Sequence, residues 1–76
     1  MEKSEFIATL LMMGFVESRI ARNRYWRGKF CAEIKNRTRN VALMVLHAGS
    51  DTDYSTFREY EPAIAWVIER IQVDEQ

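Results

Sequence analysis

The side chains of this sequence best suited to binding chemistry are cations, and most of them lie in one segment. Eight of the eleven Lys and Arg residues fall between Arg19 and Arg39, with Glu33 as the only acid among them. A formal net charge of zero therefore conceals a basic block between two acidic ones. Guanidinium and ammonium groups gathered in this way bind phosphates or carboxylates. We therefore expect this segment to form a surface that meets a charged partner.

Aromatic residues interleave with these cations and leave two kinds of partner open. In a nucleic-acid complex the cations would neutralise phosphates while Trp26 stacked on a base. In a protein complex, Trp26 beside Arg22 and Arg24 is the composition enriched at interfaces, where Arg also docks carboxylates through paired hydrogen bonds. Glu59 and Glu61, near the start of the expected last helix, would repel phosphate. A protein is therefore the favoured partner, and a nucleic acid is the alternative.

Other residue types that carry catalysis or bind metals are sparse. Cys31 and His47 are the only residues of their kinds, and the expected strand register places them on opposite faces, so that they form no nucleophilic pair. Residues 51–55 match the start of a calcium loop, but such a loop needs Gly and Glu where this chain has Thr56 and Pro62. We therefore predict no catalytic residue, no metal and no cofactor.

Turn signals divide residues 20–47 into a predicted three-stranded antiparallel meander with two-residue loops at 27–28 and 37–38. Counting outward from the two loops assigns every second residue to one face. The face expected in the core comprises Tyr25, Phe30, Ala32, Ile34, Val41, Leu43 and Val45. A one-residue slip would bury Arg and Lys side chains instead. Residues 48–54 are expected to form a polar loop.

The opposite face of the meander carries most of the cations and is expected to stay open. Its apolar margin is the third strand, which points Ala42, Met44 and Leu46 outward. The residues predicted to contact a partner lie on this face or in its turns: Arg22, Arg24, Trp26, Lys29, Lys35, Arg37, Arg39, Met44 and Leu46. Because the third strand is apolar on both faces, a homodimer through that strand or through the outer face is a further alternative.

Two amphipathic helices flank the predicted strands. Ser4 suits an N-cap, apolar residues follow at helical spacing, and Gly14 with Phe15 after it suits a helix C-terminus. The second helix is expected over residues 62–71, and residues 54–59 are either its start or a short fourth strand. The predicted fold is α+β, a two-layer α-β-β-β-α domain with both helices packed on one face of the three-stranded antiparallel meander.

Size and composition bound the class of protein. Seventy-six residues, 47% of them hydrophobic, predict a single domain over residues 1–76, with an ordered core at 4–72 and a flexible tail at 73–76. A single cysteine, without a signal peptide or a membrane span, predicts a cytoplasmic protein with no membrane partner. We expect a non-enzymatic binding module that acts as an inhibitor or adaptor, as small accessory proteins of phages and mobile elements often do.

Overall fold

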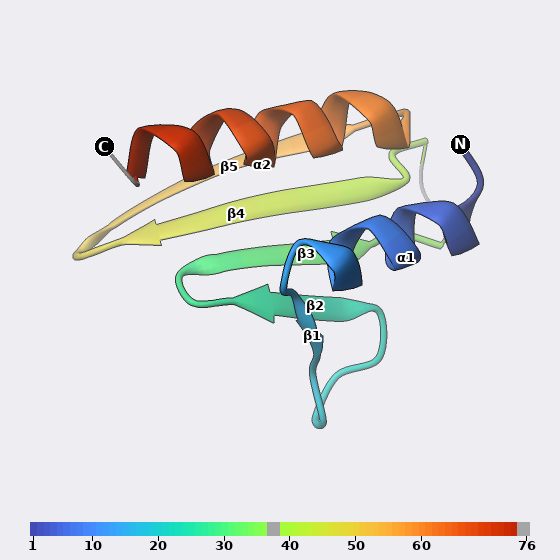
Figure 1. The fold of residues 1–76 in the computed structure, drawn as a ribbon, viewed down its shortest axis with the longest axis horizontal. Helices are drawn as coiled ribbons and strands as arrows, with labels where there is room; N and C mark the ends of the chain where they lie inside the picture. Colours follow the sequence, from blue (N-terminus) through green and yellow to red (C-terminus); the bar gives the residue numbers. More distant parts are fainter. Residues whose placement is uncertain (37–38, 75–76) are drawn as a thin grey trace.

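The computed structural model describes residues 1–36 and 39–74, and its class is α+β, as predicted (Figure 1). In chain order the elements are α1 (Lys3–Met12), β1 (Val16–Glu17), β2 (Arg24–Arg27), β3 (Phe30–Ile34), β4 (Ala42–Ala48), β5 (Asp51–Phe57) and α2 (Tyr60–Asp74). The strands form one antiparallel sheet in the order β1-β2-β3-β4-β5. The predicted meander is therefore too small, because a short strand precedes it and a long strand follows it.

Strand β5 lies where the sequence suggests a polar loop and then an ambiguous segment. A turn at Gly49 and Ser50 joins it to β4, and Gly49 has the positive φ (64°) that tight hairpin turns require. Its seven residues pair one-to-one with the seven residues of β4. The ambiguous segment 54–59 therefore continues the strand to Phe57, and α2 begins only at Tyr60.

Helix α1 ends in the way that its sequence predicts. Gly14 has a φ of 92°, and the Phe15 N–H donates a hydrogen bond to the Leu10 carbonyl (3.0 Å). Phe15 is buried, which supplies the hydrophobic contact that accompanies this kind of helix end. At the other end the N-cap is Glu2 and not the predicted Ser4.

The β2–β3 hairpin keeps its predicted faces although its pairing is shifted. Gly28 and Lys29 form the turn, one residue later than predicted, so that Tyr25 lies opposite Ala32 and not Phe30. A shift of the partner by two residues preserves which side chains share a face. Tyr25, Phe30 and Ala32 are accordingly buried together on the predicted core face.

The β3–β4 pairing is shifted by one residue, and this shift reverses the faces of β4. The connection is longer than the predicted two-residue loop, so that Ala32 lies opposite Met44 and not Leu43. A one-residue shift moves every side chain of a strand to the other face. Met44 is therefore fully buried, whereas Leu43 and Val45 lie on the open face. The predicted core positions of Leu43 and Val45 are therefore wrong, because both faces of this strand are apolar and only the length of the preceding loop distinguishes them. Val41, just before the strand, packs against the core as predicted.

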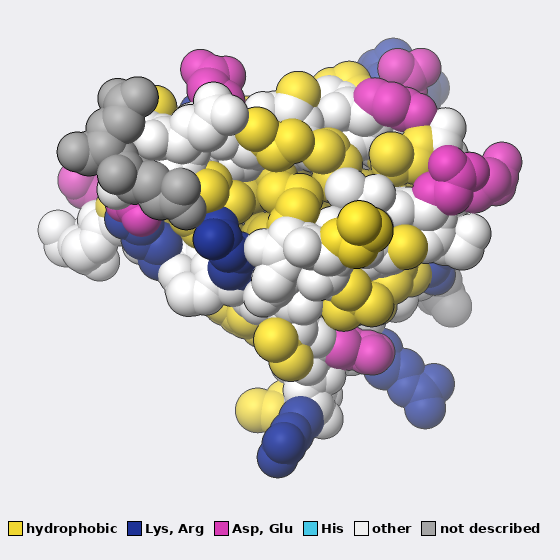
Figure 2. Space-filling view, viewed as in Figure 1, with side chains coloured by type: hydrophobic (Ala, Val, Ile, Leu, Met, Phe, Trp, Pro, Cys, Tyr) yellow, Lys and Arg dark blue, Asp and Glu magenta, His cyan; other side chains and the backbone are white. Residues whose placement is uncertain are grey.

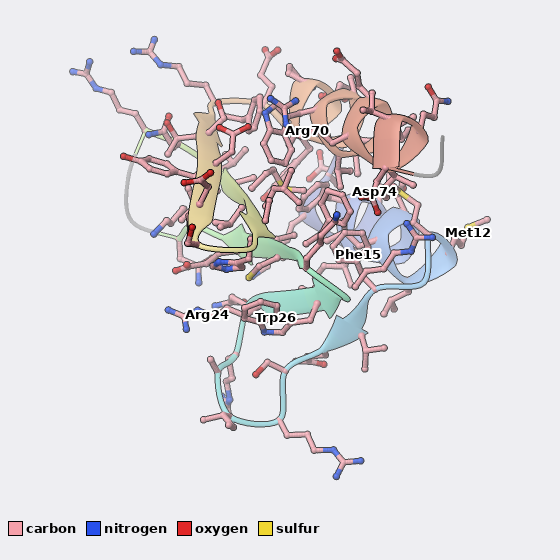
Figure 3. The ribbon with its side chains drawn as sticks, turned by 90° about the vertical axis from the view of Figure 1, so that its left-hand side faces the viewer. Met12, Phe15, Arg24, Trp26, Arg70 and Asp74 are labelled. Atoms are coloured by element: carbon pink, nitrogen blue, oxygen red, sulfur yellow. The ribbon has the colours of Figure 1, made fainter. Side chains whose placement is uncertain are left out.

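One face of the sheet shares a single hydrophobic core with both helices. The helices contribute Phe6, Leu10, Ala63 and Val67 to the same buried cluster as Met44. Figure 3 shows the labelled side chains Arg24 and Trp26 on the side of β2 away from the helices. Among the described residues, no helix covers that opposite face, which we call the open face.

Candidate binding surface on the open sheet face

A row of mostly apolar side chains crosses the open face from one edge of the sheet to the other. Direct cross-strand pairing forms this apolar row from Val16, Trp26, Cys31, Val45 and Tyr54. Residues directly opposite each other on neighbouring strands share a face and interact through their side chains. Val16, Trp26 and Tyr54 are 66%, 38% and 67% exposed, so solvent reaches the row on both edges and at β2.

Cys31 is the most enclosed residue of the apolar row, and the partly exposed Trp26 lies directly opposite it. The indole ring of Trp26 stacks on His47 of β4, with ring centroids 5.8 Å apart and planes inclined by 20°. Cys31 belongs to β3, between these two strands, and is only 6% exposed. Burial raises the pKa of the Cys31 thiol, the Arg24 charge opposes this rise, and the Glu33 charge adds to it. The thiol is therefore protonated at neutral pH and fills space as a small apolar group.

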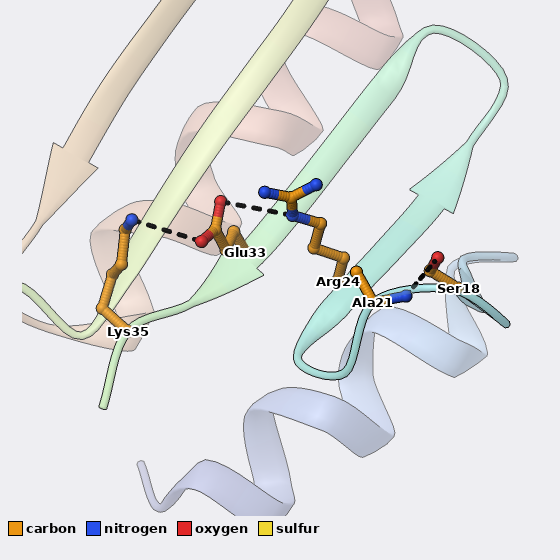
Figure 4. A network of polar contacts seen from close by, with 5 residues as sticks. All are labelled: Ser18, Ala21, Arg24, Glu33 and Lys35. Atoms are coloured by element: carbon orange, nitrogen blue, oxygen red, sulfur yellow. Dashed lines mark hydrogen bonds and ion pairs between the residues drawn. The ribbon is translucent and has the colours of Figure 1, made fainter. Parts of the chain in front are cut away.

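Three charged residues lie beside the apolar row and partly neutralise one another. Arg24 Nε lies 3.6 Å from Glu33 Oε2, and Lys35 Nζ lies 3.2 Å from Glu33 Oε1 (Figure 4). One carboxylate is thus shared by two cations. Such partly exposed ion pairs contribute only about 0–1 kcal/mol to stability, so their main effect here is on the charge that a partner meets.

The loop between β1 and β2 projects from the sheet and presents one apolar side chain between two cations (Figure 1). Ile20 is 99% exposed, and Arg19 and Arg22 flank it. The Ser18 hydroxyl oxygen accepts hydrogen bonds from the N–H groups of Ile20 and Ala21, both at 3.2 Å, and Figure 4 shows the second. Figure 2 shows basic and hydrophobic side chains gathered at the end of this projecting loop.

Several predicted contact residues lie on or beside the open face. Trp26 belongs to the apolar row, and Arg24 and Lys35 lie beside it. Arg22 was predicted on the first strand of the meander, but it lies in the projecting loop, because β2 begins only at Arg24. Arg39 is exposed in the connection between β3 and β4.

The other predicted contact residues lie elsewhere. Lys29 occupies the β2–β3 turn and forms an ion pair with Asp74 at the end of α2, on the covered side of the sheet. Met44 is fully buried and Leu46 packs against the core, so their predicted outer-face positions are wrong. Arg37 lies outside the described residues.

Sequence reasoning missed four hydrophobic residues of the open face. Leu43 and Val45 were assigned to the core by the one-residue error in β4, Val16 lay outside the predicted strands, and Tyr54 lay where the sequence left a loop, a strand and a helix start open. For Tyr54 a signal exists in the sequence. Thr52, Tyr54 and Thr56 alternate in the way that β-branched and aromatic residues do along a strand.

Cys31 and His47 share the open face, contrary to the predicted register. The charges that act on the Cys31 thiol are those of Arg24 and Glu33, and its raised pKa is unsuited to a nucleophile. Within residues 1–36 and 39–74, no three His, Cys, Asp or Glu side chains converge as metal ligands.

Neither helix in the described part of the chain combines the length and apolar composition needed to cross a membrane. Comparison with protein-family models, with curated proteins and with solved structures found no significant match to this chain. The function is therefore inferred from the arrangement of the chain's own residues.

Proposed function

We propose that this chain is a non-enzymatic binding module that docks on another protein through the open face of its sheet. The observation that supports this proposal is the apolar row, in which Trp26 lies partly exposed beside Arg24. Trp and Arg are enriched among the few residues that dominate the binding free energy of protein interfaces. Because the row crosses all five strands, its partner would meet a broad, shallow surface.

The charges around the apolar row favour a protein partner over a nucleic acid. Arg24, Glu33 and Lys35 together carry a single net positive charge, because one carboxylate neutralises one of the two cations. A phosphate backbone would have to compete with Glu33 for both cations. A protein carboxylate needs only one free edge of the Arg24 guanidinium group, while its apolar neighbours cover Trp26 and Val45.

The same arrangement suits action by occupancy, as an inhibitor or an adaptor. The domain offers a docking surface but a protonated thiol in place of a reactive one. We place it among the small accessory proteins of the kind that phages and mobile elements encode. Cys31 forms no disulfide, which suits the reducing cytoplasm, where we expect the protein to act.

Affinity capture from the native host tests the proposal with two matched variants. Trp26→Ala removes a large, partly exposed side chain from the open face, and Met12→Ala removes one from α1, where Met12 is 89% exposed. Truncation of an interface anchor costs about 2 kcal/mol or more, which is roughly thirtyfold in affinity. We expect wild type to capture a host protein, and we expect this capture to persist after nuclease treatment. The Trp26→Ala variant should lose the captured protein, and the Met12→Ala variant should retain it. Equal capture by wild type and Trp26→Ala would contradict the open face as the docking site.

A second candidate function is nucleic-acid binding through the projecting loop. Arg19 and Arg22 form no ion pair with another described residue, so both are available to phosphates. Ile20 between them is the kind of side chain that wedges between base steps in minor-groove complexes. Such binding would weaken steeply with salt and be abolished by Arg19→Glu with Arg22→Glu. A flat salt response rules this candidate out.

A further inference from the structure

The two edges of the sheet differ in how much unpaired backbone they expose. The edge strand β1 has only two residues, whereas the edge strand β5 has seven. A short edge offers few free N–H and C=O groups, and a long edge offers a template on which another strand can pair. The exposed fraction of Tyr54, 67%, shows that the middle of β5 is open to solvent.

The hydrogen bonds of β5 define which of its backbone groups face outward. The Phe57 carbonyl accepts a hydrogen bond from the Val41 N–H (2.7 Å), so the backbone of Phe57 is directed toward β4. Successive residues of a strand direct their backbone groups to opposite sides. Thr52, Tyr54 and Thr56 therefore point their N–H and C=O groups away from β4, and no described strand lies beyond them.

Strand β5 also lacks most of the features that usually protect an edge from pairing, although Asp53 points a charge toward the covered side. It contains no Pro and no Lys, and its pairing with β4 has no interruption over seven residues. Its two charges are both at its beginning. Asp53 is already paired with Arg70 of α2, at 3.1 and 3.2 Å from two guanidinium nitrogens, and this leaves Asp51 as its only unpaired charge.

We propose that β5 pairs with β5 of a second copy of this chain, antiparallel and about a two-fold axis at Tyr54. The pairing places Tyr54 opposite itself and Thr52 opposite Thr56, and aromatic and Thr–Thr pairs of this kind favour sheet formation. Each outward N–H and C=O group of these residues then finds a partner. The two open faces become one surface, on which the apolar rows of both copies meet at Tyr54.

The charges at the two ends of β5 favour the antiparallel orientation and a second copy as the occupant. Residue 58 of one copy then lies opposite residue 50 of the other, so that the strand end followed by Arg58 lies beside the strand end that begins with the partner's Asp51. Neighbouring positions alternate between faces, so these two charges attract each other across the strand ends and not as a direct cross-strand pair. Arg58 is exposed and forms no ion pair with another described residue, and Asp51 is also exposed. The two ends of the strand thus carry opposite charges that the antiparallel orientation brings side by side, whereas a parallel, in-register pairing would place Asp51 directly against Asp51.

Sedimentation of the full chain over a range of concentrations tests the proposal. Wild type is expected to shift from 9.0 kDa toward twice that mass as its concentration rises. Thr52→Pro removes an outward N–H without touching the β4 ladder, and by symmetry this deletes two hydrogen bonds of the dimer. We expect the dimer dissociation constant to rise at least about tenfold. Thr52→Ala keeps the N–H and serves as the matched control, with a change of less than about threefold.

Two substitutions of Tyr54 test the same edge of the sheet without the local backbone effect of proline. Tyr54→Lys places two like charges at the two-fold axis and should yield a monomer, whereas Tyr54→Phe should remain a dimer. All four variants should keep the wild-type circular dichroism spectrum, because these side chains are outside the core. A monomeric wild type at millimolar concentration overturns the proposal. So does a dimer that survives Thr52→Pro but not Trp26→Ala, since that result would assign self-association to the open face.

The proposal does not depend on the proposed function. Trp26→Ala should abolish docking of the partner protein and leave the dimer intact, whereas Tyr54→Lys should abolish the dimer. If wild type is monomeric and Thr52→Pro instead impairs capture of a different protein, β5 pairs with that protein. The second copy would then be the wrong occupant.

Discussion

The two faces of the sheet carry equivalent rows of side chains, one residue apart along each strand. On the covered face, Tyr25, Ala32 and Met44 lie opposite one another beneath the helices. On the open face, the next residues, Trp26, Cys31 and Val45, form the matching row. Both rows are apolar in composition. What separates them is the layer of helices, which removes one row from water and leaves the other available for contact.

This comparison shows that apolar content alone does not identify the core of a small sheet. A residue on the covered face contributes its full burial to stability, because Phe6, Leu10 and Val67 close over it. An open-face residue that stays exposed, such as Trp26 or Tyr54, contributes less to folding and can therefore vary with less cost to the fold. Three experiments would break or sharpen this distinction.

The largest difference is expected between Met44→Asp and Val45→Asp. The first places a carboxylate in the core without a partner and should cost about 4 kcal/mol or more, enough to unfold most of a domain of this size. The second places it on the open face and should cost about 1 kcal/mol, mainly through lower β propensity. Urea unfolding followed by circular dichroism measures both. Similar losses for the two variants would show that the faces of β4 are not distinct.

An intermediate effect is expected for the reactivity of Cys31. Burial raises the pKa of its thiol, and Trp26 is its direct cross-strand neighbour. We expect slow reaction with a thiol reagent at pH 8 in wild type and a several-fold faster reaction in Trp26→Ala. Met12→Ala, distant from the thiol, is the control and should react like wild type. An unchanged rate in Trp26→Ala would mean that the neighbouring strands alone bury the thiol.

The smallest effect is expected at the margin of the covered side, where the Met1 amino group lies 2.7 Å from Glu61 Oε1. Their hydrogen bond raises the pKa of the amino group and lowers the pKa of Glu61. The contact therefore stabilises the fold at neutral pH. This contribution is lost as the pH falls through the lowered Glu61 pKa or rises through the raised amino pKa.

Replacement of Glu61 by Gln should return the pKa of the Met1 amino group toward its ordinary value, which an NMR titration detects. The neighbouring substitution Glu59→Gln is the matched control and should leave the pKa of the Met1 amino group raised. Because both groups are exposed, unfolding curves of the two variants should hardly differ. A large loss of stability in Glu61→Gln alone would show that this margin belongs to the core.

Much of the fold could be predicted where the sequence carries a polar alternation or a backbone signal. Gly14 and Phe15 marked the end of α1, and the alternation of cations with Tyr25 and Ala32 defined the faces of β2 and β3. Strand β4 could not be assigned in this way, because no polar residue interrupts Val41–Leu46. The first half of β5 was taken for a loop and its second half was left open between a strand and a helix start, because the side chains that it turns toward the helices include Asp53 and Ser55.

The candidate surface was predicted only in part, and for the same reason. Trp26 and Arg24 lay on strands whose faces were well defined, so their predicted positions agree with the structure. The apolar margin of the surface was predicted at Met44 and Leu46, which instead pack in or against the core. The assignment of a side chain to a face depends on the strand register, and the predicted register of β4 was wrong by one residue.

The sequence by itself determined the block of cations, the two amphipathic helices and the faces of the first hairpin, because local spacing decides each of these. The tertiary structure alone decided which side of β4 is buried and which cations stay unpaired. Both depend on cross-strand distances, such as that between Arg24 and Glu33, and a loop one residue longer changes them without altering any local pattern. It also decided that β5 ends the sheet with a free edge, since a strand is an edge only relative to its neighbours.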